Sequence, residues 1–358
     1  MKEKNKVTEN GTLRIKCKDL KAYEKTKNGW KVSDKEFPNA LEVIKLFKTH
    51  GKFDVLKDTK NPEFLKGQVS KDGKIQGARI NVLPNEKILN KAYSIFAKNL
   101  TLHDENSNDH WDVLYENPGG GFAHLYTIDK VKRSVKGKYK EVEDFSRRYK
   151  KLREKVFKAL NDKNDEIALP MFTLLETYMR VGNETYFKAN GHKGLTTLKK
   201  KDVFIKGNQI EFNYIGKKGV PMDIVKEFPL VYLKRLKEKL KKLKKDDFIF
   251  ANSEGHPLKD TYFMEAFERY CGKRFYPHIV RSFYATEKAR EFLKNHKESN
   301  KEKVKELYMN IAEKLGHKKF DKKNNEWKSD YNVTIHYYLQ PELVEKIDKI
   351  VKWRNVFI

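Results

Sequence analysis

The pattern of apolar residues changes near residue 130, and this change divides the chain into two parts. Before it, short segments rich in strand-forming residues are separated by glycine turns, such as Asp72-Gly73 and the glycine run within 117–121. After it, apolar side chains recur every three or four residues, beginning with Phe145 and Tyr149. The first pattern is typical of strands joined by tight turns, and the second is typical of amphipathic helices.

The sequence therefore predicts an α+β protein with two domains. A small β-rich N-terminal domain is expected over residues 1–130, and a mostly α-helical domain containing one small sheet over residues 131–358. The basic segment 130–140 is interpreted as a linker, and the polar segment 318–330 as a loop. Further elements are predicted from local periodicity: helices over 145–160, 171–179, 233–243, 283–293, 304–315 and 339–351, and a hairpin over 203–214.

The charge of the chain points to a polyanionic partner. Its 358 residues include 77 Lys and Arg against 50 Asp and Glu, a formal net charge of +27. Such an excess favours nucleic acid as the partner. Aromatic residues make up 12% of the chain, which is enough to bury a core and argues against a ribosomal or chromatin-packing protein.

The two cysteines, Cys17 and Cys271, are too few for a disulfide framework or a zinc knuckle. No apolar stretch approaches the length of a membrane span, and no apolar segment of a signal peptide follows Met1. We therefore expect an intracellular protein without a membrane partner.

Familiar catalytic signatures are missing from the sequence. It contains no G-x-x-x-x-G-K-[ST] loop, no H-E-x-x-H pair and no G-x-S-x-G elbow. Its His, Asp and Glu residues show no tight metal-ligand spacing, so neither a metal nor a nucleotide cofactor is expected. Two hypotheses remain: a pure nucleic-acid binder, or an enzyme that attacks phosphodiesters with side chains alone. The second requires cationic donors, a nucleophile and an acid.

Residues of these types occur in the segments 174–198, 212–219, 277–286, 312–317 and 337–341. Taken together, these segments resemble the type IB DNA topoisomerases, and the short poxvirus and bacterial enzymes most of all. The segment 174–198, which contains RVGNE and GLTTL, resembles the first catalytic segment of that family. Four later segments also resemble catalytic segments of the family: 212–219 with Gly-Lys, 277–286 with an arginine, 312–317 with a histidine, and 337–341 with tyrosine three residues before proline.

The resemblance implies a function and a set of roles. Members relax supercoiled DNA through a 3′-phosphotyrosyl intermediate, without ATP or metal. The resemblance implies that the phosphate is held by Arg180, Arg281 and His317. It also implies that Lys217 is the general acid and Tyr338 the nucleophile. It also implies that residues 1–130 form a DNA clamp. We expect a monomer that closes on double-stranded DNA, in the cytoplasm or nucleoid, or in a virion or virus factory if the protein is viral.

Each of these residues also has an ordinary structural interpretation. Arg180 could pair with Glu184 on a helix surface, and Arg281 could form a salt bridge at the edge of the core. His317 follows a helix end, where a histidine often only caps the helix. Lys217 lies in a turn beside Lys218, which is the competing candidate for the acid.

Two departures from the family leave alternatives open. His278 stands three residues before Arg281, the H-x-x-R arrangement of tyrosine recombinases, so site-specific strand exchange is the alternative function. His278 itself is expected to support the catalytic groups or contact the DNA backbone. The interval between His317 and Tyr338 is also longer than usual, which keeps Tyr337 and Tyr331 as competing nucleophiles. A binding module with a decayed catalytic domain is a third hypothesis.

Overall fold

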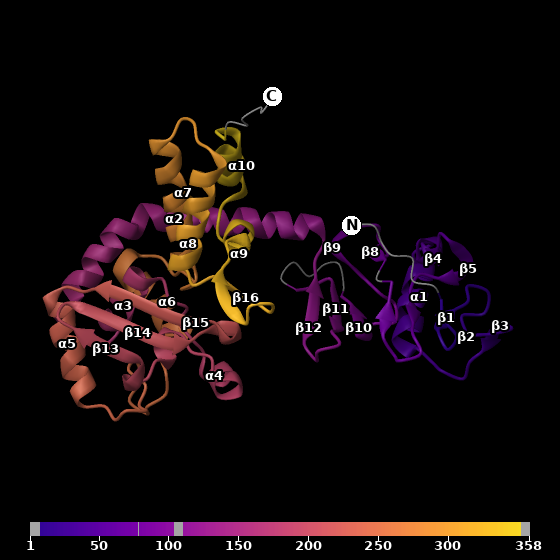
Figure 1. Cartoon of the computed structure of the whole chain (residues 1–358), viewed down its shortest axis with the longest axis horizontal. Helices are drawn as coiled ribbons and strands as arrows, with labels where there is room; N and C mark the ends of the chain where they lie inside the picture. The colour runs from indigo at the N-terminus through magenta and orange to yellow at the C-terminus, as the bar shows by residue number, and fades with distance from the viewer. Residues whose placement is uncertain (1–7, 78, 104–109, 352–358) are drawn as a thin grey trace. The chain divides into compact units, whose positions relative to one another are not determined.

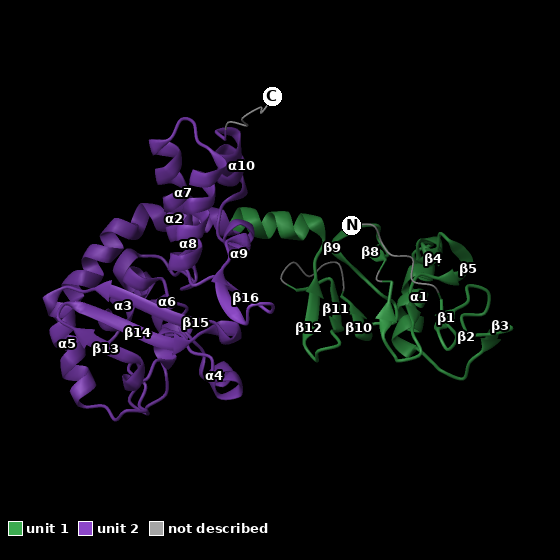
Figure 2. Cartoon of the chain, viewed as in Figure 1, with its two compact units in different colours: residues 1–137 green, residues 138–358 purple. Residues whose placement is uncertain are grey.

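The computed structural model describes residues 8–77, 79–103 and 110–351. The chain forms two compact units, residues 1–137 (unit 1) and 138–358 (unit 2), and the division lies within helix α2 (Ile128–Ala159) (Figure 2). Unit 1 is built mainly from strands and unit 2 mainly from helices with small sheets, which confirms the predicted α+β class (Figure 1). Within the described ranges, no helix has the length and apolar character needed to span a membrane.

The strands of unit 1 are short and pair antiparallel. The larger sheet has the order β3-β2-β1-β6-β7. Its strands are β1 (Leu13–Ile15), β2 (Ala22–Thr26), β3 (Gly29–Val32), β6 (Gln68–Val69) and β7 (Ile75–Gln76). A second sheet joins β10 (Lys98–Leu102), β11 (Val113–Glu116) and β12 (Phe122–Leu125), and two further pairs are β4 (Lys57–Asp58) with β5 (Asn61–Leu65) and β8 (Ile80–Val82) with β9 (Ile88–Tyr93).

Both hairpins predicted in this part are present. Strands β6 and β7 pair across the Asp72-Gly73 turn, where Gly73 has a φ of 76°. Strands β11 and β12 pair across the glycine run 117–121. Helix α1 (Pro38–Thr49) was not predicted, although its buried residues Ala40, Val43, Ile44 and Phe47 have helical spacing. A short helix η1 (Phe53–Leu56) follows it.

Unit 2 combines a three-stranded antiparallel sheet with several helices and a separate two-stranded hairpin. The sheet joins β13 (Val203–Lys206), β14 (Gln209–Ile215) and β15 (Pro221–Glu227), so the predicted hairpin gains a third strand. Helix α3 (Ala168–Thr177) packs against β15 and against α5 (Leu230–Lys241). The remaining helices are α4 (Glu184–Asn190), α6 (Asp260–Cys271), α7 (Ile279–Asn295), α8 (Lys301–Lys314), α9 (Asn332–Tyr337) and α10 (Pro341–Lys349), with single turns η2 (Leu195–Thr197), η3 (Lys200–Asp202) and η4 (Lys217–Gly219).

Three elements after residue 128 differ from the prediction. The segment 130–140 is helical and continuous with α2, so the linker interpretation is wrong. The segment 318–330 is a hairpin of β16 (Lys318–Asp321) and β17 (Glu326–Ser329), not a loop. The predicted last helix over 339–351 begins only at Pro341, and the separate helix α9 ends at Tyr337.

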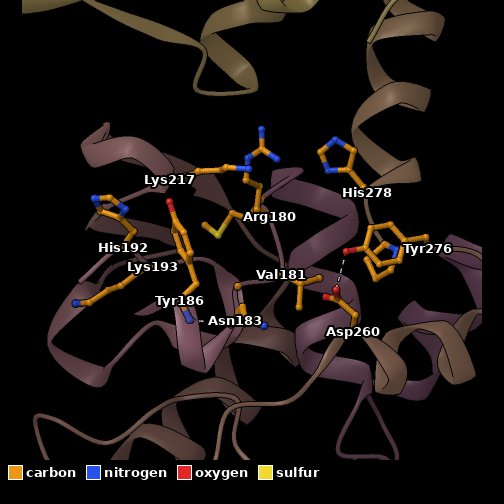
Figure 3. Close-up of a pocket in the computed structure, with 13 residues that line it drawn as sticks. Arg180, Val181, Asn183, Tyr186, His192, Lys193, Lys217, Asp260, Tyr276 and His278 are labelled. Atoms are coloured by element: carbon orange, nitrogen blue, oxygen red, sulfur yellow. Dashed lines mark hydrogen bonds between the residues drawn. The ribbon is translucent and has the colours of Figure 1, made fainter. Parts of the chain in front are cut away.

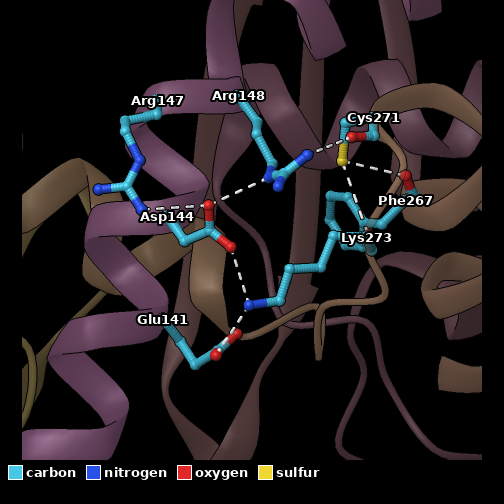
Figure 4. A network of polar contacts seen from close by, with 7 residues as sticks. All are labelled: Glu141, Asp144, Arg147, Arg148, Phe267, Cys271 and Lys273. Atoms are coloured by element: carbon cyan, nitrogen blue, oxygen red, sulfur yellow. Dashed lines mark hydrogen bonds and ion pairs between the residues drawn. The ribbon is translucent and has the colours of Figure 1, made fainter.

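A polar network fastens α2 to the end of α6 (Figure 4). Asp144 of α2 accepts hydrogen bonds from Lys273 at 2.8 Å and from Arg148 at 3.1 Å. Lys273 also reaches Glu141 at 2.9 Å, and Arg148 donates to the carbonyl of Cys271 at 3.0 Å. This network therefore connects two helices that are far apart in the sequence.

We predict that Asp144→Asn lowers stability at neutral pH and weakens its pH dependence in acid. The hydrogen bond from Lys273, followed by that from Arg148, holds the pKa of Asp144 at about 2. A depressed carboxyl pKa stabilises the fold above the unfolded-state pKa, near 4, and that contribution is lost as the pH falls towards 2. Because the pair is partly exposed, we expect a loss of about 1 kcal/mol at pH 7. Thermal unfolding of the wild-type protein and the variant between pH 2 and pH 7 measures this loss. Parallel curves of stability against pH would contradict the prediction.

Candidate active site

The turn that carries Arg180 is fixed by its neighbours. Helix α3 ends because Tyr178 adopts the left-handed conformation, with a φ of 58°, and its N–H bonds the carbonyl of Leu174. Two residues later the chain passes Arg180 and reaches Gly182, which also has a positive φ of 104°. Asn183 then caps α4 by accepting a 2.8 Å hydrogen bond from the N–H of Tyr186. The RVGNE sequence is therefore a tight turn between two helices.

The GLTTL segment fixes the RVGNE turn through main-chain hydrogen bonds. The N–H of Leu195 donates to the carbonyl of Arg180 at 2.8 Å, and the N–H of Thr196 donates to the carbonyl of Val181 at 2.7 Å. A Cβ atom on Gly194 would lie 2.6 Å from the Arg180 carbonyl oxygen and 2.7 Å from the Cα of Gly182. Only glycine fits there, so the two motifs form one structural unit.

Arg281, on α7, is buried with 3% of its surface exposed. Its guanidinium donates to the carbonyl of Tyr178 at 2.6 Å and to the carbonyl of Leu315 at 2.7 Å. A third contact, at 3.1 Å, joins it to Nε2 of His317. The buried Nε atom of Arg281 has no hydrogen-bond partner in the part of the chain that the structure describes. Arg281 therefore connects the ends of α3 and α8, and its Nε–H group remains as a further donor.

The contacts of His317 define its protonation. A guanidinium can only donate, so Nε2 of His317 is the acceptor in its contact with Arg281. The ring proton then lies on Nδ1, which donates to the hydroxyl of Thr334 at 2.8 Å. Burial, followed by the charges of Arg281 and Arg180, lowers the pKa of His317 to about 3. The imidazole is therefore neutral at physiological pH.

Among the three candidate nucleophiles, only Tyr338 contacts the arginines. Its hydroxyl accepts a hydrogen bond from Arg180 at 2.9 Å, and its ring lies 5.3 Å from the guanidinium of Arg281. Tyr338 is 3% exposed, whereas Tyr337 is 65% exposed. The ring of Tyr331 packs 6.0 Å from that of Tyr308. The structure thus brings Tyr338 together with Arg180, Arg281 and His317, whose ring lies 4.7 Å from that of Tyr338.

Lys217 lies in the turn between β14 and β15 and lines two cavities, of about 400 and 350 Å³. Arg180 lines both cavities as well. Figure 3 shows Lys217 and His278 around the first cavity, together with Arg180. Arg281 and His317 line the second. The five predicted site residues are therefore adjacent, although no hydrogen bond joins Lys217 to the other four in the described structure.

The site is strongly electropositive. Burial, followed by the charges of Arg281 and Arg180, lowers the pKa of His278 to about 3. Burial also lowers the pKa of Arg281 itself. Within the described ranges, none of Arg180, Lys217 and Arg281 forms an ion pair with a carboxylate. Arg281 is buried without a counter-charge, which is costly, and a phosphate entering the second cavity would supply that charge.

The site contains no evident metal-binding group. No cluster of three or more His, Cys, Asp or Glu side chains suited to a metal occurs in the residues that the structure describes. The acidic residue of the first cavity, Asp260, accepts a 2.8 Å hydrogen bond from the hydroxyl of Tyr276 (Figure 3). The chemistry open to this arrangement is charge stabilisation and proton transfer by side chains at a phosphodiester.

Three contributors to the site were not identified from the sequence. Thr334 holds the ring of His317, and Lys193 lines both cavities while paired with Asp202 at 2.7 Å. Lys138, at the start of unit 2, lies 5.6 Å from the ring of Tyr338. Lys193 could have been found, because it lies within the 174–198 motif. Nothing in the basic segment around Lys138 distinguishes it from its neighbours.

Residues 129–339 match the family model of the eukaryotic DNA topoisomerase I catalytic core. The chain belongs to this family. The match begins at the start of α2 and ends one residue after Tyr338, so it includes all five predicted site residues. The predicted family is therefore confirmed, and the matching core is that of a type IB topoisomerase.

Individual relatives match smaller parts of the chain. The DNA topoisomerase 1B of Acanthamoeba polyphaga mimivirus is 31% identical over 104 residues, which cover 28% of this chain and 31% of that protein. Two solved structures of the XerH site-specific recombinase, bound to a difH substrate and to a palindromic difH substrate, also match. The pre-cleavage complex has 19% identity and a TM-score of 0.32 over 48% of this chain and 50% of that one. The post-cleavage complex has 20% identity and a TM-score of 0.34 over 48% of each chain.

We predict that Gly194→Ala destabilises the protein and displaces Arg180. The added methyl group meets main-chain atoms of Arg180 and Gly182, which cannot move aside as a side chain could. We expect a loss of about 1–3 kcal/mol in the free energy of unfolding, measured by urea denaturation. The control is Gly137→Ala, where a Cβ meets no atom within 4 Å and the helical site gains up to about 1 kcal/mol. Equal effects of the two substitutions would contradict the packing argument.

Proposed function

We propose that the protein is a type IB DNA topoisomerase that relaxes supercoiled DNA by cutting and rejoining one strand. The observation that carries the proposal is the hydroxyl of Tyr338, which accepts a hydrogen bond from Arg180. Arg180, Lys217 and Arg281 form no ion pair with a carboxylate in the described ranges. Such a group is suited to the extra negative charge of a pentacoordinate phosphate. Membership of the topoisomerase I family supports the same activity.

In the proposed reaction, the hydroxyl oxygen of Tyr338 attacks the phosphorus atom of one strand and its proton is lost to water. The P–O5′ bond breaks as the P–O bond to tyrosine forms, and Lys217 protonates the departing 5′ oxygen. Arg180 and Arg281 donate to the non-bridging oxygens. The free strand swivels, and its 5′-OH then attacks the phosphotyrosine in the reverse reaction. Because the ester conserves the bond energy, no ATP is needed.

His317 requires one rearrangement to join this reaction. In the structure, Nε2 of His317 accepts a hydrogen bond from Arg281, so it presents no proton to a phosphate. A phosphate oxygen placed between them would accept from Arg281 and from a protonated Nε2, with Nδ1 then accepting from the hydroxyl of Thr334. The Thr334 hydroxyl can donate or accept, so it fits both states.

The partner in this proposal is double-stranded DNA. The net charge of +27 supports it, and so do the lysines at 318 and 319, which line the second cavity from strand β16. Residues 1–130 are proposed to be the DNA clamp, and the protein to act as a monomer without a metal or a small-molecule cofactor. It would then be DNA-associated inside the cell, virion or virus factory. The curated relative is matched over about a third of its length, so these assignments belong to the proposal.

Site-specific recombination is the alternative function, and one observation favours it. His278, the first residue of the H-x-x-R arrangement, lies 5.2 Å from the ring of Tyr338. A recombinase would form a multimer on DNA carrying paired sites and exchange strands between them. Relaxation by a monomer on DNA without such sites would favour the topoisomerase.

We predict that the protein relaxes plasmid DNA in EDTA without ATP, and that detergent traps a covalent adduct with a free 5′-OH. Tyr338→Phe should lower adduct formation by about 10³-fold or more while DNA binding persists, because phosphate contacts supply most of the affinity. Tyr337→Phe is the matched control and should retain activity, since its side chain is exposed. An adduct that survives Tyr338→Phe and disappears with Tyr337→Phe would assign the nucleophile to Tyr337. A strict requirement for magnesium would contradict the mechanism.

We predict that Lys217→Ala slows cleavage of an ordinary phosphodiester by about 10²-fold or more, as expected for loss of a general acid. A substrate with sulfur at the 5′ bridging position should be cleaved at nearly the wild-type rate, because a thiolate leaves without a proton. Lys218→Ala serves as the control, since Lys218 is the neighbouring lysine of the same turn. Equal losses on both substrates would remove Lys217 from the role of acid.

A further inference from the structure

The main chain around Tyr338 leaves the carbonyl groups of Tyr337 and Leu339 without helical partners. Helix α9 ends there, and the N–H groups of Tyr338 and Leu339 both bond the carbonyl of Thr334. The next helix begins at Pro341, which has no N–H to donate. The carbonyls of Tyr337 and Leu339, which lie on either side of Tyr338, therefore need donors from elsewhere in the chain.

Two adjacent residues of α2 supply these donors. The ammonium of Lys138 donates to the carbonyl of Tyr337, and the hydroxyl of Tyr139 donates to the carbonyl of Leu339. Both donors belong to unit 2, as does the segment that they hold. The two bonds thus fasten the main chain immediately before and immediately after Tyr338.

Each donor is committed to this contact. Tyr139 is buried with 6% of its surface exposed. Lys138 forms no ion pair with a carboxylate in the described part of the chain, and burial lowers its pKa to about 8. Its ammonium also lies 5.1 Å from the ring of Tyr139 and 5.6 Å from that of Tyr338. A lysine that only solubilised the helix would extend into water instead.

We propose that Lys138 and Tyr139 are positioning residues that hold the segment 337–339, so that the hydroxyl of Tyr338 already lies against Arg180 before DNA binds. The inference rests on the proposed function, because it takes Tyr338 as the nucleophile. In-line attack needs the phenol oxygen close to the phosphorus and aligned with the leaving oxygen, and a displacement of about 1 Å lowers rates by about 10²-fold. Fixing both flanking carbonyls leaves rotation of the Tyr338 side chain as the main remaining freedom.

The test is single-turnover cleavage of a DNA duplex whose short downstream strand dissociates after cleavage, so that the adduct accumulates. We expect Lys138→Met and Tyr139→Phe each to lower the cleavage rate constant by about 10- to 100-fold. The dissociation constant for uncleaved DNA should stay within about twofold. Religation, started by adding a 5′-OH strand, should slow by a similar factor, because both directions cross the same in-line transition state.

Matched variants separate positioning from general damage. Lys140→Met removes an exposed lysine of the same helix, and Tyr149→Phe removes a hydroxyl that donates to the Leu175 carbonyl at 3.4 Å. Both should cleave at the wild-type rate. Lys138→Arg, which keeps a cationic donor, should recover most of the rate. A purely structural defect would lower the fraction of active enzyme and the melting temperature while the remaining enzyme kept its rate constant.

Each outcome decides one question. Rates within twofold of wild type for Lys138→Met and Tyr139→Phe would overturn the positioning role, as would a loss confined to DNA affinity or to active fraction. Tyr338→Phe is measured in parallel. If it forms no adduct while the α2 variants are fast, only the positioning inference fails. If it still forms adduct, or if the wild-type protein forms none, the proposed function fails and the inference with it.

Discussion

The architecture of the site depends on a buried guanidinium with no carboxylate to neutralise it among the described residues. Arg281 bonds two main-chain carbonyls and one neutral imidazole, so the ends of α3 and α8 are held around it. Burying a cation in this way costs free energy, which the apolar packing of α7, α8 and α10 must offset. Burial lowers the pKa of His278 and of His317, and the uncompensated charge of Arg281 lowers both further. Stability is thus reduced at the place where an anion would be bound.

The parts of this arrangement that were predictable from sequence are those with a local chemical constraint. RVGNE and GLTTL are recognisable because a tight turn, a helix cap and a glycine contact require those residue types at that spacing. The hairpins at Asp72-Gly73 and over 203–214 were predictable for the same reason, since Gly73 and the turn residue Gly207 have positive φ values of 76° and 59°. In each case the backbone conformation of the turn requires a particular residue type, so that residue type in the sequence indicates the turn.

The parts that were missed depend on contacts between distant segments. The first turns of α2 are rich in lysine and bury little before Tyr139, so no apolar period distinguishes them from a basic linker. Strands β16 and β17 are exposed or half-buried along their length, and only Asn325, with a φ of 53°, marks their turn. The role of Lys138 is defined by the carbonyl of a residue almost two hundred positions away. Nothing near it in the sequence carries that information.

The long interval between His317 and Tyr338 has a structural explanation in the same hairpin. Strand β16 leaves directly after His317, and the N–H of Asp330 returns to donate to the His317 carbonyl at 2.9 Å. The hairpin of β16 and β17 therefore starts and ends beside His317, so the chain that follows it continues from the same place. Thr334 then lies within 2.8 Å of the His317 ring, and Tyr338 follows one helical turn later. Because an antiparallel hairpin closes on itself, the added length leaves the spatial relation of histidine and tyrosine unchanged.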